Sequence, residues 1–94
     1  MAKAVWQSVV LAESDKCVQL EGNAYFPPDA IQREYFLPSE TTTECPWKGT
    51  ASYYHIEVNG QRNADAAWYY PNPRAAAVEI LGHVAFWRGV KIAP

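Results

Sequence analysis

The chain has 94 residues, so we expect residues 1–94 to form a single domain. Apolar residues make up 49% of the sequence and aromatic residues 14%, and this supply of large core-forming side chains excludes intrinsic disorder. A net charge of −2 argues against non-specific binding to nucleic acid or to an anionic membrane. No stretch is long and apolar enough to span a bilayer, so neither nucleic acid nor membrane is an expected partner.

The cysteines and histidines bear on compartment and metal binding. The apolar residues at the N-terminus stop after Trp6, which is too early for a signal-peptide core, so we expect a cytoplasmic protein with reduced thiols. A structural zinc site needs four ligands, typically in two close pairs. The available ligands Cys17, Cys45, His55 and His83 lie far apart in the sequence. We therefore expect no disulfide, no metal and no cofactor.

The N-terminal third predicts short β elements. Residues 5–12 predict a strand. Glu13-Ser14-Asp15 predicts a turn, and residues 16–21 a returning strand, so residues 4–21 are expected to form a hairpin. Pro27-Pro28-Asp29 then predicts a single helical turn with Asp29 as its cap.

The middle of the chain contains the clearest strand signals. Residues 34–37 predict a short strand that ends at Pro38, and residues 39–49 predict the longest irregular stretch. Residues 50–58 predict a strand, Asn59-Gly60 a two-residue type I′ turn, and residues 61–70 the partner strand.

The last part predicts one short α-helix over residues 73–82. Asn72 suits the N-cap, Pro73 suits the first helical position, and a run of alanines favours helix. Residues 83–92 predict one or two closing strands. The fold class is therefore mainly β, with about seven short strands in a barrel-like antiparallel assembly and one helix.

The register of the central hairpin contains a conflict. A two-residue turn pairs Val58 with Gln61 and places Glu57 opposite Arg62. In this register the apolar positions of residues 50–58 and those of residues 61–70 lie on opposite faces of the sheet. One extra residue near Asn63, a β-bulge, would bring both sets to one face.

Two longer motifs resemble a known family. Residues 41–54 (TTTECPWKGTASYY) and residues 65–73 (DAAWYYPNP) resemble the signatures of the family called domain of unknown function 427, and residues 76–87 resemble its closing segment. His83 stands where the family commonly has Tyr. The resemblance covers nearly the whole chain. It implies a tent-like β fold of the kind that also hosts methionine sulfoxide reductase B, without implying a settled activity.

Members of that family are sometimes labelled nucleotidyltransferase-like. Nucleotidyl transfer usually needs paired metal-binding carboxylates and a loop that cradles phosphates. The chain has neither an Asp-x-Asp pair nor a Gly-rich loop. The residues therefore do not support that activity.

The segment Cys45-Pro46-Trp47-Lys48 contains the most reactive-looking group. A thiol three residues from an ammonium can have a lowered pKa, and His55 is a candidate base for it. The alternative interpretation is that Cys45 is a small buried residue and Lys48 a solvated surface charge.

The sequence favours a polar–aromatic pocket between residues 39–49 and the hairpin of residues 50–70. It binds a small polar or anionic ligand, or a partner. Tyr70 is a further candidate for its wall, whereas Trp87 is assigned to packing. Alternatives are an enzyme with Cys45 as nucleophile, supported by Lys48 and His55 or Asp65, and a pure interaction module. The residues expected to converge are Thr43, Cys45, Lys48, Tyr53, Asp65 and Trp68.

Overall fold

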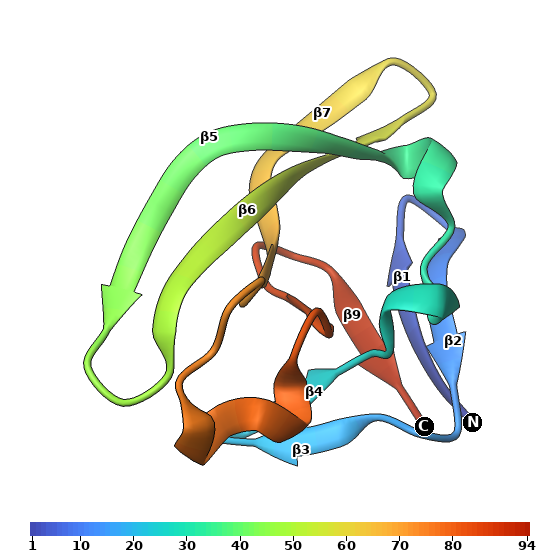
Figure 1. Ribbon diagram of the computed structural model, residues 1–94. Coiled ribbons are helices and arrows are strands. Elements are labelled where there is room, and N and C mark those ends of the chain that lie inside the picture. Colours follow the sequence, from blue (N-terminus) through green and yellow to red (C-terminus); the bar gives the residue numbers. More distant parts are fainter.

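The computed structural model describes residues 1–94 and confirms a mainly β fold (Figure 1). The nine strands are β1 (Ala2–Trp6), β2 (Val9–Ser14), β3 (Val18–Leu20), β4 (Asn23–Tyr25), β5 (Phe36–Cys45), β6 (Gly49–Val58), β7 (Gln61–Tyr69), β8 (Val84–Phe86) and β9 (Lys91–Ala93). The three helical segments, all 3-10 helices, are η1 (Pro28–Ala30), η2 (Arg33–Tyr35) and η3 (Ala75–Ile80). None of them is long and apolar enough to span a membrane.

The strands form three separate antiparallel sheets in the orders β5-β6-β7-β8, β2-β1-β9 and β3-β4. In Figure 1 the long β5–β6 hairpin arches over one side, and the sheet containing β1 and β9 stands on the other. The β3–β4 hairpin lies at the base, and the two chain termini lie next to each other. The sheets do not join into a closed barrel, so the arrangement is tent-like.

Apolar side chains are buried on both faces of the β5–β8 sheet. Consecutive residues of a strand point to opposite faces. Tyr54 accordingly packs against one buried cluster, which contains Phe26 and Ile56, and Tyr53 against another, which contains Tyr25 and Ile80. The second cluster forms the base of the candidate site described below.

The central hairpin confirms the predicted turn and the position of the irregularity. Asn59 and Gly60 both have positive φ, 51° and 78°, as a type I′ turn requires. The ladder shifts register between Tyr54, which pairs with Ala67, and Ile56, which pairs with Asn63.

The size of this bulge differs from the expectation. Three residues of β7 lie opposite the single residue His55 of β6, so the strand contains two extra residues instead of one. A shift of two leaves the facing of the side chains unchanged, and Trp68 pairs with Tyr53. The expectation that the apolar sets share one face was therefore wrong. Because apolar side chains are buried on both faces of the sheet, the two apolar sets can lie on opposite faces.

The predicted N-terminal hairpin of residues 4–21 was wrong. The chain already reverses at Gln7 and Ser8, which have φ values of 52° and 63°, and β1 pairs with β2. β3 pairs with β4 instead of with the first strand. The sequence contains no sign of this turn, because neither Gln7 nor Ser8 is Gly or Asn, the usual residues at positive φ.

The stretch of residues 39–49, expected to be irregular, is mostly strand. β5 begins at Phe36, passes through Pro38 and continues to Cys45. β5 lies at the edge of its sheet, where a proline and a run of polar residues are tolerated because one side of the strand has no ladder to maintain. A register shift between Pro38 and Thr42 accommodates the proline.

The helix expected over residues 73–82 is present in shorter form as a 3-10 helix, η3. Its N-cap is Arg74 instead of Asn72, and neither η3 nor η1 has a side-chain cap, so Asp29 is not a cap either. Ala77 has non-helical angles, φ −118° and ψ 22°, within η3. Ala77 and Ile80 are both buried, and their spacing of three matches the 3-10 period better than the α period.

Candidate functional site

A pocket of about 210 Å³ opens on one face of the β5–β8 sheet. Tyr53 and Trp68 are register partners on β6 and β7, so their side chains project from the same face. Lys48 precedes β6, Tyr70 follows β7 and Trp87 follows β8. These five residues, four aromatic rings and one ammonium group, line the pocket.

The aromatic walls are fixed by contacts with one another. The rings of Trp68 and Trp87 are 6.0 Å apart at an interplanar angle of 84°, so they form a corner. Trp68 also packs edge-on against Tyr25 at 6.2 Å and donates its indole N–H to the Tyr25 hydroxyl at 3.2 Å. Since Tyr25 is fully buried, Trp68 is anchored to the core and also lines the pocket.

Lys48 is buried, with a relative exposure of 7%, so the interpretation as a solvated surface charge was wrong. Its ammonium donates a hydrogen bond to Glu21, and lies 5.4 Å from the centroid of the Tyr70 ring and 5.7 Å from that of Trp47. Burial lowers the pKa of Lys48, but the bond to Glu21 and the neighbouring Tyr25 and Tyr70 outweigh burial and raise it above its ordinary value. Lys48 is therefore charged at neutral pH.

Glu21 is the partner that sequence reasoning missed. It occupies the turn between β3 and β4, with φ 53°, followed by Gly22 with φ 80°. Its carboxylate accepts from Lys48 and from the Trp47 indole N–H at 3.2 Å, and both bonds lower the pKa of Glu21. The sequence predicts Glu21 at the end of a strand over residues 16–21, and no signal links it to a residue 27 positions later.

The backbone around Lys48 is packed against the segment after β7. The Lys48 carbonyl accepts from the N–H of Arg74 at 2.8 Å. Gly49 has φ 115°, and a Cβ at that position would lie 3.3 Å from the carbonyl oxygen of Asn72. The glycine thus permits a close approach that fixes the start of β6 against the segment after β7.

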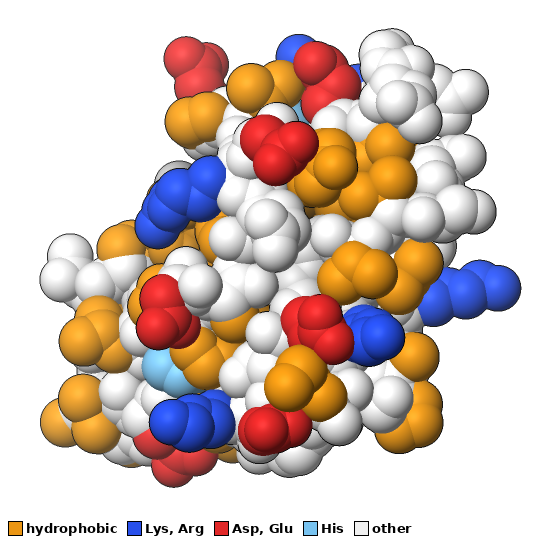
Figure 2. All heavy atoms as spheres, turned by 90° about the vertical axis from the view of Figure 1, so that its right-hand side faces the viewer, with side chains coloured by type: hydrophobic (Ala, Val, Ile, Leu, Met, Phe, Trp, Pro, Cys, Tyr) orange, Lys and Arg blue, Asp and Glu red, His pale blue; other side chains and the backbone are white.

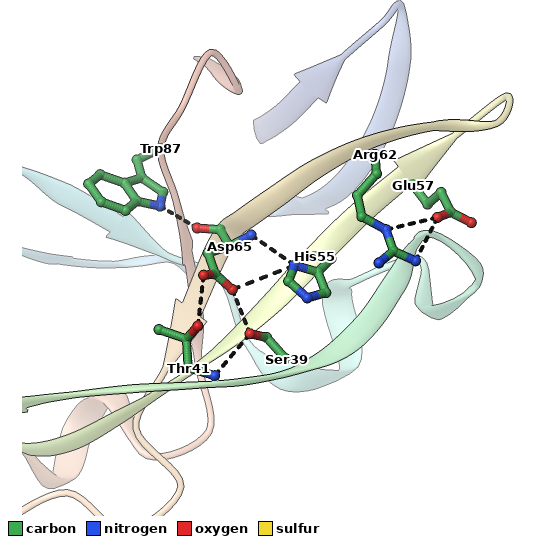
Figure 3. Close-up of polar contacts among 7 residues, drawn as sticks. All are labelled: Ser39, Thr41, His55, Glu57, Arg62, Asp65 and Trp87. Atoms are coloured by element: carbon green, nitrogen blue, oxygen red, sulfur yellow. Dashed lines mark hydrogen bonds and ion pairs between the residues drawn. The ribbon is translucent and has the colours of Figure 1, made fainter.

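Asp65 is the centre of the polar cluster drawn in Figure 3. Its carboxylate accepts from the hydroxyls of Ser39 at 2.6 Å and Thr41 at 2.8 Å, and its backbone N–H donates to Nδ1 of His55 at 3.0 Å. The bond from Ser39 is the main cause of a lowered pKa of Asp65. Because Nδ1 accepts the amide proton, neutral His55 carries its own proton on Nε2.

Asp65 also positions Trp87, which forms one wall of the pocket. The Asp65 carbonyl accepts from the indole N–H of Trp87 at 2.6 Å, and the Ala66 carbonyl accepts from the backbone N–H of Trp87 at 3.0 Å. Asp65 has φ 52° within the bulge. The bulge thus turns a carbonyl outward to fix Trp87, and Asp65 acts on the pocket through that bond without lining it.

Thr43 and Cys45 lie on β5, beside the pocket. The hydroxyl of Thr43 is 2.9 Å from that of Tyr53, so Thr43 orients a pocket residue. Cys45 is half-buried and packs against the cluster beneath the pocket. It pairs with Gly49, and His55 lies six residues farther along β6, which is roughly 20 Å of strand. The fold therefore does not bring Cys45 together with His55 or Asp65.

The expected constellation is thus partly assembled. Lys48, Tyr53 and Trp68 line one pocket, and Tyr70 joins them as expected. Trp87, assigned to packing from the sequence, lines the pocket as well. Its role depends on the hydrogen bond to the bulge residue Asp65, 22 positions earlier, which a local pattern does not reveal.

The cysteines have separate surroundings. Cys17 and Cys45 are both free thiols, and burial raises the pKa of Cys17. No group of three His, Cys, Asp or Glu side chains is arranged to hold a metal ion.

The comparison with known proteins agrees with the resemblance seen in the motifs. The profile of the family described as domain of unknown function (DUF427) matches residues 1–93. No curated protein matches the chain significantly. The match extends over nearly every residue of the fold described above, including β6, β7 and the segment that carries Trp87. The chain therefore belongs to the DUF427 family.

Proposed function

We propose that the chain binds a small polar ligand that has a flat apolar face. The observation that carries this proposal is the convergence of four aromatic rings and one charged, buried lysine on one pocket. Ligand sites combine apolar and aromatic walls with a few placed polar groups in this way. The volume of about 210 Å³ is below the ~300–1,000 Å³ of sites for drug-sized molecules, which favours a ligand of one or two rings.

The exposure of the walls supports a binding role over simple core packing. Trp87 remains 44% exposed although two hydrogen bonds hold it in place. Tyr53 and Trp68 are also only partly buried. Aromatic rings that are fixed yet open to solvent offer stacking surface to a ligand without a need to reorganise.

The alternatives have less support. For the enzyme, Cys45 lies apart from His55 and Asp65, and Lys48 already has a partner in Glu21. For the interaction module, the face drawn in Figure 2 carries apolar side chains interspersed with acidic and basic ones, so that face lends it no support. A docking surface typically presents a larger contiguous patch.

The test is a titration of the 15N-labelled protein with benzamide, a neutral one-ring probe, followed through the indole N–H signals. We expect the signals of Trp68 and Trp87 to shift in a saturable manner and that of Trp6 to stay. Tyr53→Leu removes a pocket wall and should abolish the shifts. Tyr69→Leu changes a neighbouring tyrosine that packs on the opposite side of the sheet, and should keep them. No shift with benzamide, or equal shifts in Tyr53→Leu, would count against the pocket.

A further inference from the structure

We infer that Glu21 sets the charge preference of the pocket: by pairing with Lys48 it makes the site select uncharged ligands that carry a hydrogen-bond acceptor over anionic ones. This inference rests on the proposed function, since it concerns the ligand class of the same pocket. It assigns a specificity-determining role to a residue that does not line the pocket.

The charges at the pocket are already balanced. Lys48 is the one charged lining residue, and it forms an ion pair with Glu21. A second cation, Arg88, stacks on Trp87 at 4.5 Å, and its charge is among the causes of the lowered pKa of Asp65, so a carboxylate lies near it as well. An entering anion is attracted by Lys48 and repelled by Glu21, the partner of Lys48. It gains little net attraction while it loses its hydration.

A neutral ligand that carries a hydrogen-bond acceptor is not repelled by the charge of Glu21. An ammonium has three N–H donors, and one of those of Lys48 is directed at Glu21. Tyr70 also takes part in a hydrogen bond with Lys48, and the Trp47 ring face accepts only weakly. A carbonyl or hydroxyl oxygen of a ligand can accept the remaining N–H of Lys48 while the pair with Glu21 stays intact.

The two members of the pair differ in accessibility. The Lys48 side chain is 9% exposed and that of Glu21 is 47% exposed. Replacing the carboxylate of Glu21 therefore removes a negative charge at the margin and leaves the ammonium in the pocket wall. The Glu21→Gln variant keeps the shape of the side chain and its capacity to accept a hydrogen bond.

The experiment measures dissociation constants for benzamide, benzoate and benzylamine from the indole signals of Trp68 and Trp87. We expect the wild-type chain to bind benzamide at least about tenfold more tightly than benzoate. Glu21→Gln should raise the affinity for benzoate at least about tenfold and leave that for benzamide within about threefold. Added salt should weaken the gained benzoate binding.

A matched control removes a carboxylate from an ion pair outside the pocket. Glu57 pairs with Arg62 at 3.0 Å on the hairpin (Figure 3), and Glu57→Gln should leave all three affinities unchanged. Two results would overturn the inference while the proposed function stands: benzoate binding to the wild type as tightly as benzamide, or a preference that Glu21→Gln does not alter. The first result is measured on the wild type, so it overturns the inference even if Glu21→Gln fails to fold. If none of the three probes shifts the tryptophan signals, the proposed function fails too.

Discussion

Lys48 donates a hydrogen bond to Glu21, 27 residues earlier in the chain, and so joins the start of β6 to the β3–β4 turn. These elements belong to different sheets. The contact thus holds two parts of the tent-like fold together. It also explains how a lysine can lie buried in a wall of aromatic rings, since the carboxylate compensates the charge that burial would otherwise disfavour.

Removing Glu21 should lower the stability of the fold more than removing Lys48. Glu21→Ala leaves a buried ammonium without a carboxylate and should lower the melting temperature clearly. Lys48→Met keeps an apolar stem against Tyr70, and the half-exposed Glu21 retains its bond from Trp47, so the loss should be below about 1 kcal/mol. Thermal unfolding followed by circular dichroism checks the order. A larger loss in Lys48→Met would show that the ammonium itself stabilises the fold.

Stability should fall in acid because of two carboxylates. The pKa values of Glu21 and Asp65 are lowered, mainly by the hydrogen bonds from Lys48 and Ser39 respectively. A lowered folded-state pKa gives stability that is present above the ordinary carboxyl value of about 4 and is lost as the pH falls through the folded value. Urea midpoints between pH 6 and pH 2 should show this loss, and Asp65→Asn should flatten the curve. The exposed Asp29→Asn serves as control and should leave its shape unchanged.

Asp65 should couple the bulge to the pocket. Asp65→Ala removes acceptors for Ser39 and Thr41 and places a Cβ residue without a polar side chain at φ 52°. We expect a loss of about 2 kcal/mol, against about 1 kcal/mol for Asp65→Asn, which tolerates the left-handed region better. The indole N–H signal of Trp87 should move in both variants. An unchanged Trp87 signal in Asp65→Ala would mean that the bulge does not position this wall.

Two glycines should differ in their tolerance of alanine. Gly60 has φ 78° and open space around it, so Gly60→Ala should cost only the backbone strain, about 1 kcal/mol. Gly49 combines φ 115° with a contact of 3.3 Å to the backbone of Asn72, so Gly49→Ala should cost more, about 2–3 kcal/mol. Urea unfolding measures both. Equal losses would show that the segment around Asn72 moves aside freely.

Local signals predicted the parts of the fold that local geometry determines. Asn59-Gly60 specifies its turn because both residues accept positive φ, and the paired Glu57 and Arg62 follow from it. The reversal at Gln7-Ser8 was missed because its residues carry no such signal. β5 was missed because its polar, proline-containing sequence is permitted by its place at the sheet edge, which only the complete topology reveals.

The candidate site was predictable only for those residues that lie in local sequence motifs. Lys48, Tyr53 and Trp68 lie in motifs rich in amphipathic side chains, and the pairing of Tyr53 with Trp68 needs only the correct size of the bulge. Glu21 and Trp87 reach the site from distant segments, through an ion pair and a bulge carbonyl. A local pattern contains no information about such long-range contacts.

The most direct test of the central claim is a fragment screen of the labelled protein with uncharged one- and two-ring compounds, mapped over all amide and indole signals. We expect saturable shifts that centre on the lining residues Lys48, Tyr53, Trp68, Tyr70 and Trp87. These shifts should disappear in Tyr53→Leu and persist in Tyr69→Leu. Shifts that centre elsewhere on the molecule, or a screen in which no fragment perturbs the signals of Trp68 and Trp87, would contradict it.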